Sequence, residues 1–360
     1  NLNKKYYNLI KEFKNKTKIL LADGATGTNY FSSGLQPGDP PEMWNLKKSN
    51  NVLNLHKEFI LAGANIILTN SFGANSSRLK FHNIENLVKE INFVSARLAK
   101  KAISSTPKFG NILVAGSIGP TGEIFKSNGG FFMYEDALEV FYKQAISLKE
   151  GGVDFLWIET LSSLEEVDAA LSAADKANIF SVITMSFDTA KKTMMGVSPK
   201  EFIKFIYKRK VKPLAIGANC GVGPSELLSS INEMKTYLNN ETLLVAKGNC
   251  GIPQYKSGEI SYSGNNQIMA RYAILCKLLG VDIVGGCCGT TPEHIKYMSD
   301  SLNQSSEFLK KSKFEEIFFK YKNSFDELIA SEIGQPWQGI SSKRTKLKIN
   351  KRKIRRLINK

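Results

Sequence analysis

The cysteines of this chain are placed where they favour metal chemistry over disulfide bonding. Five cysteines occur among 360 residues, and two of them, Cys287 and Cys288, are adjacent. An odd number with an adjacent pair makes a poor disulfide framework, so metal or redox chemistry is the better interpretation. Three thiolates that leave one position open make a reactive zinc site, whereas structural zinc is normally closed by four protein ligands.

Three of these cysteines follow segments that we predict to be strands, and we expect Cys220, Cys287 and Cys288 to hold the metal. The flanking glycines at 285, 286 and 289 supply the irregular backbone that two adjacent ligands need. Cys250 also follows a predicted strand, and it is either an inert wall residue or a group near the metal. Cys276 lies within a helical run, where a lone cysteine is usually a small buried hydrophobe.

Two acids end other predicted strands. Asp23 follows the first apolar run and Glu159 the fourth. Each has an ordinary alternative as a helix cap or a salt-bridge residue. Two acids at strand ends beside a thiolate site favour recognition of an amino group.

Eight β-rich runs must position these residues, and amphipathic helical stretches such as Leu53–Ala62, Ala137–Lys149 and Leu164–Ala174 separate them. The runs are near-continuous apolar segments, as in parallel strands buried on both faces. This repeat predicts an α/β fold, a (β/α)8 TIM barrel whose catalytic groups lie at the C-terminal ends of the strands. A doubly wound sheet is the alternative, but no G-x-G-x-x-G follows the first strand. The predicted strands are Lys18–Asp23, Asn65–Thr69, Ile112–Ser117, Asp154–Glu159, Ser181–Ser186, Leu214–Ala218, Leu243–Ala246 and Asp282–Val284.

The chain divides by composition into a barrel, residues 1–300, and a helical extension with a basic tail, residues 301–360. Phe314–Leu328 is predicted to be a helix, and Trp337 an anchor by which the extension docks. The formal net charge is +16, of which residues 343–360 carry ten positive charges and no negative one, leaving +6 for the rest. Such a tail binds nucleic acid or anionic membrane, remains solvated, or docks on another subunit. We expect no nucleic-acid partner and a possible homo-oligomer.

The chain lacks the features of a membrane or secreted protein. No run of eighteen apolar residues predicts a membrane span, and Asn1–Lys18 lacks the apolar core of a signal peptide. We therefore expect a cytoplasmic protein without a membrane partner.

Several blocks of the sequence resemble the homocysteine S-methyltransferase family. The resemblance runs from about Ile19 to His294, and its most specific part is the double cysteine with the distant Asn-Cys pair. Asp23–Thr28 (DGATGT) is similar to the first-strand signature, Gly217–Cys220 (GANC) and Gly285–Ile295 (GGCCGTTPEHI) to the two cysteine motifs, and Gly116–Pro120 (GSIGP) and Ile158–Thr160 (IET) to two further blocks.

The resemblance implies a (β/α)8 barrel, a Zn²⁺ ion held by Cys220, Cys287 and Cys288, and homocysteine as the methyl acceptor. Asp23 and Glu159 match the acids that hold the amino group of homocysteine. Gly24, Thr69 and Phe72 stand where the family lines the homocysteine pocket.

The methyl donor is less closely defined. Leu35–Asn45 resembles the betaine–homocysteine branch, in which a tryptophan, here Trp44, faces the donor. A quaternary cation prefers an aromatic face, although packing is the ordinary alternative for Trp44. Thr160 and Gly73 stand where that branch carries aromatic residues.

We therefore expect zinc-dependent methyl transfer from glycine betaine or a similar onium compound to homocysteine, giving methionine. The same chemistry with a sulfonium donor, such as dimethylsulfoniopropionate or S-methylmethionine, is the first alternative. A non-catalytic protein that binds zinc and nucleic acid is the alternative of another class.

Overall fold

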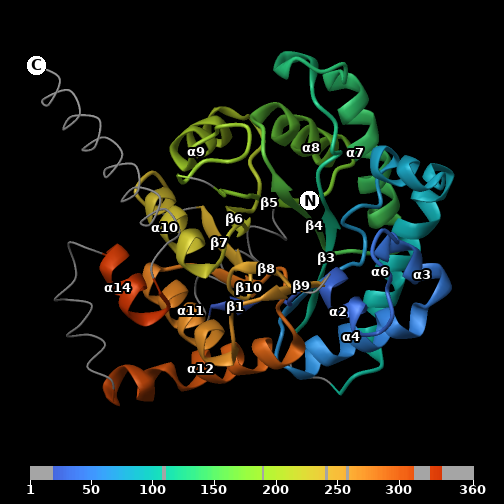
Figure 1. The fold of residues 1–360 in the computed structure, drawn as a ribbon. Helices are drawn as coiled ribbons and strands as arrows, with labels where there is room; N and C mark the ends of the chain where they lie inside the picture. The colour runs from blue at the N-terminus through green and yellow to red at the C-terminus, as the bar shows by residue number, and fades with distance from the viewer. Residues whose placement is uncertain are drawn as a thin grey trace, which may run out of the picture.

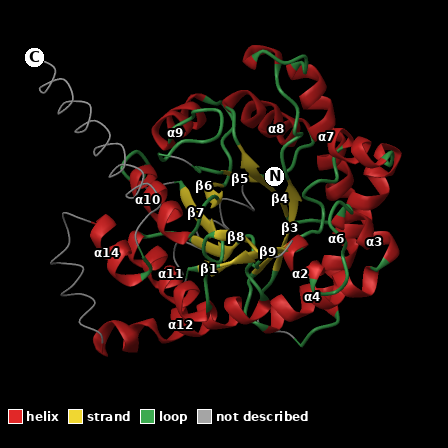
Figure 2. Cartoon of the chain, in the orientation of Figure 1, coloured by secondary structure: helices red, strands yellow, loops and turns green. Residues whose placement is uncertain are grey.

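The chain folds into a ring of eight parallel strands enclosed by helices (Figures 1 and 2). The computed structural model describes residues 19–107, 111–188, 190–239, 242–256, 259–311 and 325–334. Among the described helices, none combines the length and the apolar character that a membrane span requires.

The strands pair in the order β1-β10-β7-β6-β5-β4-β3-β2, and every pair is parallel. A parallel bridge between Ala22 and Ile66 joins the first and last members of this order, so the ring closes. The hydrogen bond from the Asp23 N–H to the Ile66 carbonyl, 2.9 Å, belongs to this closure. The strands are β1 (Leu20–Leu21), β2 (Ile66–Leu68), β3 (Leu113–Ile118), β4 (Phe155–Leu161), β5 (Ser181–Met185), β6 (Ala215–Cys220), β7 (Leu243–Gly248) and β10 (Ile283–Gly286).

Helices connect successive strands around the outside of the ring. The longer ones are α4 (Ser49–Leu61), α6 (Val88–Ser104), α7 (Tyr134–Gly151), α8 (Leu164–Lys176), α9 (Pro199–Lys208), α10 (Pro224–Lys235), α11 (Asn266–Leu279) and α12 (Pro292–Lys311). Shorter ones are α2 (Gly27–Phe31), α3 (Trp44–Lys47), α5 (Ser76–Leu79) and α14 (Phe325–Glu332), with 3-10 turns at Pro41–Met43, Lys80–His82, Glu85–Leu87 and Lys126–Asn128. Ser198 and Glu201 form a reciprocal capping box at the start of α9.

Each predicted strand overlaps a barrel strand, which confirms the predicted (β/α)8 class. The antiparallel hairpin of β8 (Pro253–Lys256) and β9 (Glu259–Tyr262) was not predicted. The predicted helix Phe314–Leu328 lies largely outside the described residues, which resume at α14, and Trp337 and the tail at 343–360 lie wholly outside them. Helix α12 spans the predicted domain boundary at residue 300, and that boundary stays a prediction.

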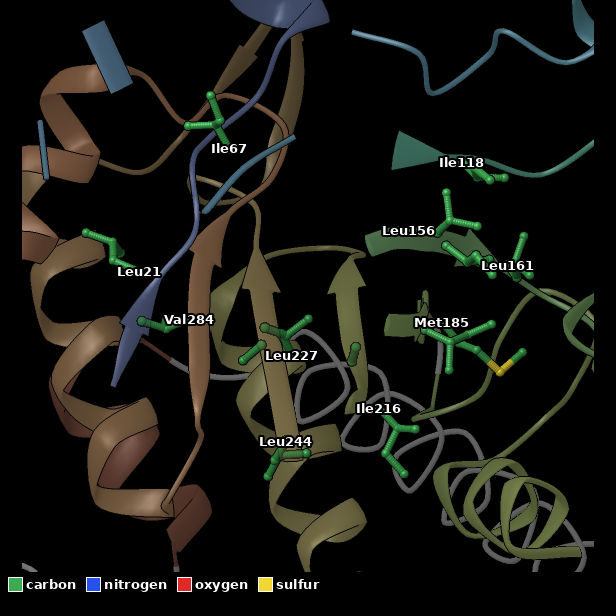
Figure 3. Packing of buried hydrophobic residues seen from close by; sticks show 14 of the residues in the cluster. Leu21, Ile67, Ile118, Leu156, Leu161, Met185, Ile216, Leu227, Leu244 and Val284 are labelled. Carbon is green, nitrogen blue, oxygen red and sulfur yellow. The ribbon is translucent and has the colours of Figure 1, made fainter. Parts of the chain in front are cut away.

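Side chains alternate along each strand between two apolar layers. One layer packs the strands against the surrounding helices and includes Leu21, Ile67, Leu156, Ile216, Leu244 and Val284 (Figure 3). The other fills the inside of the barrel and includes Ala22, Ile66, Trp157, Val182 and Val245. Trp157 is fully buried in this inner layer. Residues two positions beyond the inner layer enter the barrel at its C-terminal end, where the chemistry lies.

Candidate active site

Three cysteine sulfurs converge at the C-terminal end of the barrel. Cys220 ends β6, and Cys287 and Cys288 directly follow β10. Their sulfur atoms lie within 4.8 Å of one another, and those of Cys220 and Cys288 are 4.0 Å apart. Tetrahedral coordination with Zn–S bonds of about 2.3 Å places sulfurs about 3.8 Å apart. The three thiols therefore fit a metal ion that keeps a fourth position for a ligand.

Two glycines and one non-glycine residue shape the backbone around these thiols. A Cβ at Gly286 would lie 2.1 Å from Thr290 Cγ2, and one at Gly289, whose φ is +76°, would lie 2.4 Å from Tyr262 Cγ. Cys220 itself has a φ of +60°. Such a conformation costs a non-glycine residue about 1–3 kcal/mol, and it is retained mainly at functional sites.

Hydrogen bonds within the group bias Cys288 towards a thiolate, while they raise the pKa of Cys220. The thiols of Cys220 and Cys287 lower the pKa of Cys288 to about 3, and the side chain of Tyr262 on β9 also hydrogen-bonds to Cys288 and lowers it. The anionic sulfur suits a metal cation, because the thiolate is the form that binds metal.

Asn219 links the cysteine motif to the strand that carries Glu159. Its buried side chain accepts hydrogen bonds from the Thr160 N–H (2.9 Å) and the Thr184 hydroxyl (2.7 Å), and it donates to Thr160 Oγ1 (2.7 Å). Thr160 has a φ of +66°, a second left-handed residue beside the thiols. The asparagine of the Asn-Cys pair therefore holds the end of β4 in position.

Asp23 and Glu159 are both buried at the same end of the barrel. Asp23 Oδ2 accepts a hydrogen bond from the Leu68 N–H at 2.7 Å, and Glu159 Oε1 accepts one from the Ser117 hydroxyl at 2.7 Å. Burial raises the pKa of each carboxyl to about 7. A cation lowers such a pKa by favouring the charged form, so the pair is suited to bind a positive group.

A buried lysine stands beside these acids. Lys247 on β7 is 3% exposed, and its Nζ lies 3.6 Å from Asp23 Oδ1 and 3.2 Å from the Gly24 carbonyl oxygen. Burial lowers the pKa of Lys247, but the charges of Asp23, Glu159 and the cysteines outweigh burial and raise it. The lysine is therefore positively charged, and its charge lowers the pKa of both acids, which opposes the effect of burial.

Thr69, Phe72 and Gly24 lie on the neighbouring strand ends. The Thr69 hydroxyl bonds to Ser71 Oγ (2.6 Å) and accepts from the Ser117 N–H (3.0 Å), tying β2 to β3. The Phe72 ring covers Gly119, where a Cβ would approach within 2.6 Å of it. Gly24 has no room for a side chain, since a Cβ would lie 2.5 Å from the Thr290 carbonyl oxygen.

Trp44 is buried at the start of α3, not on an open loop. Its ring packs on Tyr30 with centroids 4.8 Å apart, and Lys48 Nζ lies 4.4 Å from its centroid. Burial, with the charges of Asp23 and Glu42, raises the pKa of Tyr30. The ring of Tyr30 thus stands between Trp44 and the acid site.

A cavity of about 350 Å³ opens beside Phe72. Its lining includes Pro41, Glu42, Gly73 and Arg78. The buried Glu42 carboxylate accepts a hydrogen bond from the Gly73 N–H at 2.6 Å, and a Cβ at Gly73 would lie 2.8 Å from Glu42 Oε1. A carboxylate therefore occupies the space next to position 73.

The thiol of Cys250 lies outside the group of three cysteines. Its sulfur is 3.3 Å from His294 Nε2 on α12, while its N–H donates to the Cys288 carbonyl oxygen at 2.9 Å. Cys250 therefore supports the backbone of the metal motif. Cys276 is buried in α11, as expected of a small hydrophobe.

Comparison with known proteins identifies the family. Residues 20–302 match the sequence profile described as homocysteine S-methyltransferase. The chain belongs to the homocysteine S-methyltransferase family. This membership supports methylation of homocysteine as the activity, and it confirms the resemblance found in the sequence.

Solved structures of the homocysteine methyltransferase MmuM from Escherichia coli share the fold. The metallated form has a TM-score of 0.67 at 21% identity, covering 81% of this chain and 99% of that chain. The oxidized form has a TM-score of 0.64 at 22% identity, covering 79% and 97% respectively. The apo form has a TM-score of 0.63 at 21% identity, covering 80% and 97%.

For this homocysteine S-methyltransferase family member, the structure brings together the three predicted cysteines and the two predicted acids. Two polar residues of the same site were missed, Lys247 and the hairpin residue Tyr262. The sequence did contain a signal for Lys247. Side chains alternate along a strand, and Val245 belongs to the inner layer, so residue 247 also points into the barrel. The predicted strand ended at Ala246, two residues before the end of β7 at Gly248.

Proposed function

We propose that the protein transfers a methyl group from a small onium donor to homocysteine, with zinc held by Cys220, Cys287 and Cys288. The observation that carries this proposal is the convergence of three sulfurs within 4.8 Å at the end of a barrel of this family. Two buried acids beside them supply the means to hold an amino acid.

Different residues of the chain act on the sulfur and on the amino group of homocysteine. Bound zinc keeps a thiol ligand deprotonated, which makes the acceptor sulfur nucleophilic near neutral pH. Asp23 and Glu159 pair with the α-ammonium and so orient the sulfur towards the donor. Gly24, Thr69 and Phe72 form the adjoining wall of the homocysteine pocket.

The transfer is a balanced displacement at the methyl carbon. The acceptor thiol loses its proton to solvent, and its sulfur forms a bond to the methyl group as the bond from that methyl to the positive heteroatom breaks. The electron pair of the broken bond leaves with the heteroatom, which departs as a neutral amine or sulfide. A positively charged donor is required, because a neutral amine or ether is a poor leaving group.

Glycine betaine is our first candidate donor, with dimethylsulfoniopropionate and S-methylmethionine as the sulfonium alternatives. We assign donor recognition to Trp44, whose ring already accepts the Lys48 ammonium at 4.4 Å. Lys48 is exposed and can leave this position. Trp44→Ala is expected to weaken donor binding while homocysteine binding changes little, and equal weakening of both would remove Trp44 from the donor site.

A cytoplasmic location belongs to the same proposal, since the chemistry needs reduced thiols and these persist in a reducing compartment.

The direct test is to incubate zinc-loaded protein with homocysteine and each donor and to measure methionine by mass spectrometry. Methionine from one donor is the expected result. Cys287→Ala should lose both zinc and turnover, whereas Cys276→Ala removes a buried thiol outside the cluster and should keep one zinc per chain. Turnover by metal-free protein, or by Cys287→Ala, would overturn the mechanism.

A further inference from the structure

Lys247 and Asp23 are two buried, oppositely charged groups whose hydrogen-bonding capacity is incompletely used. An ammonium group has three N–H donors, and within the described residues Lys247 Nζ makes one hydrogen bond, to the Gly24 carbonyl oxygen at 3.2 Å. The ion pair with Asp23 Oδ1 is 3.6 Å long. Asp23 Oδ1 itself has no hydrogen-bond partner in the described part of the chain. Lys247 therefore keeps N–H donors for a further ligand, and its long ion pair is the contact that it makes with Asp23 Oδ1.

Keeping such groups buried is costly. A buried polar atom without a partner loses its hydration with nothing in return, and replacing a buried ion pair with apolar residues is often neutral or stabilising. The barrel elsewhere fills its interior with apolar side chains such as Ile66 and Val245. The polar group at this end is therefore better explained by a ligand than by stability.

The charges of the group specify what the ligand must carry. When both acids are ionised, two carboxylates and one ammonium leave a single net negative charge, which the α-ammonium of an amino acid balances. The α-carboxylate of the same ligand then brings a new negative charge only one carbon atom away. Lys247 is the cation that stands beside the acids. It can therefore pair with the α-carboxylate of the ligand while Asp23 and Glu159 pair with its α-ammonium.

We infer that Lys247 binds the α-carboxylate of the acceptor, so that the site recognises a complete amino-acid zwitterion. This inference rests on the proposed function, since it takes homocysteine as the acceptor. Positive and negative groups then alternate around the ligand: Lys247 contacts its carboxylate, and the two acids contact its ammonium. An aminothiol without a carboxylate does not make this contact with Lys247 and should bind more weakly.

Three thiols that differ in one charged group test this assignment. They are homocysteine, 3-amino-1-propanethiol, which lacks the carboxylate, and 4-mercaptobutanoate, which lacks the amine. Their affinities for zinc-loaded wild-type protein, Lys247→Met and Lys247→Arg are measured by calorimetry, with zinc content and thermal unfolding recorded for each variant.

Wild-type protein should bind homocysteine about 10- to 100-fold more tightly than 3-amino-1-propanethiol, as a charge-assisted hydrogen bond predicts. In Lys247→Met this ratio should fall below about threefold through weaker homocysteine binding, while the aminothiol binds at least as tightly as before. The preference over 4-mercaptobutanoate should remain, because the acids are untouched. Lys247→Arg should restore part of the ratio.

Equal affinity of wild-type protein for homocysteine and 3-amino-1-propanethiol would overturn the assignment, whether or not any variant folds. A Lys247→Met protein that weakens all three thiols equally would also overturn it, since Lys247 would then be an internal counter-ion. The proposed reaction fails separately, if homocysteine binds with the expected ratio but no donor yields methionine.

Discussion

Replacing Asn219 with alanine should destabilise the protein and displace the end of β4. Asn219 makes three buried hydrogen bonds, two to Thr160 and one to Thr184. At about 1 kcal/mol each, their loss costs about 3 kcal/mol. Thr160 can then leave its left-handed conformation, which returns about 1 kcal/mol. The free energy of unfolding should therefore fall by about 2 kcal/mol.

The functional effect follows from the position of Glu159 immediately before Thr160. If Thr160 relaxes, the Glu159 carboxylate moves away from the place where it would meet the ammonium of homocysteine. We expect homocysteine binding to weaken by about tenfold or more, because small displacements of an oriented group cost this much. Asn219 Nδ2 is 3.9 Å from Cys287 Sγ, too far to make a strong bond, so zinc content should remain at one per chain.

Thr184→Val is the matched control. It removes one hydrogen bond to Asn219 and keeps both bonds to Thr160, so its cost should be about 1 kcal/mol and its effect on homocysteine affinity small. Unfolding is measured in urea at equal zinc saturation, because bound metal adds to stability. An Asn219→Ala protein no less stable than Thr184→Val, or one with wild-type homocysteine affinity, would refute the reasoning.

Two further outcomes are expected at the same end of the barrel. Because burial raises the pKa of Asp23 and Glu159 to about 7, both acids gain negative charge as the pH rises from 6 to 8. Calorimetry over this range should show that the preference for homocysteine over 4-mercaptobutanoate increases. A constant ratio of the two affinities would contradict the role of the acids. Gly289→Ala places a Cβ 2.4 Å from Tyr262 Cγ, whereas Gly34→Ala shares a positive φ, +94°, with nothing within 4 Å. Competition with a chelator should therefore show at least tenfold weaker zinc binding for Gly289→Ala alone, and equal effects would exclude the Tyr262 contact as the cause.

Much of the fold could be predicted because the signals are local. Each apolar run overlaps a barrel strand, since residues buried on both faces must be apolar wherever the ring closes. The strand ends were less accurate: β7 continues through Lys247 to Gly248, and β6 through Asn219 to Cys220. Backbone pairing continues past the last apolar residue because it needs only N–H and carbonyl groups, whereas the prediction followed side chains.

The hairpin of β8 and β9 could not be anticipated in the same way. Its segment carries no long apolar run, and its place over Gly289 depends on a contact between Tyr262 and a motif that lies 27 positions further along the chain. The pairing of Cys250 with His294 depends likewise on two segments that meet only in the folded barrel.

The sequence by itself determined the barrel, the three cysteines and the two acids, because residue type and strand-end position are properties of the chain. The folded structure was needed to show that Lys247 pairs with Asp23, that Asn219 holds Thr160, and that Lys48 lies over Trp44. Distances between strand ends and the burial of charges arise when the ring closes. Closure brings Gly24 and Lys247 together from positions 223 residues apart in the chain, and it removes them jointly from water.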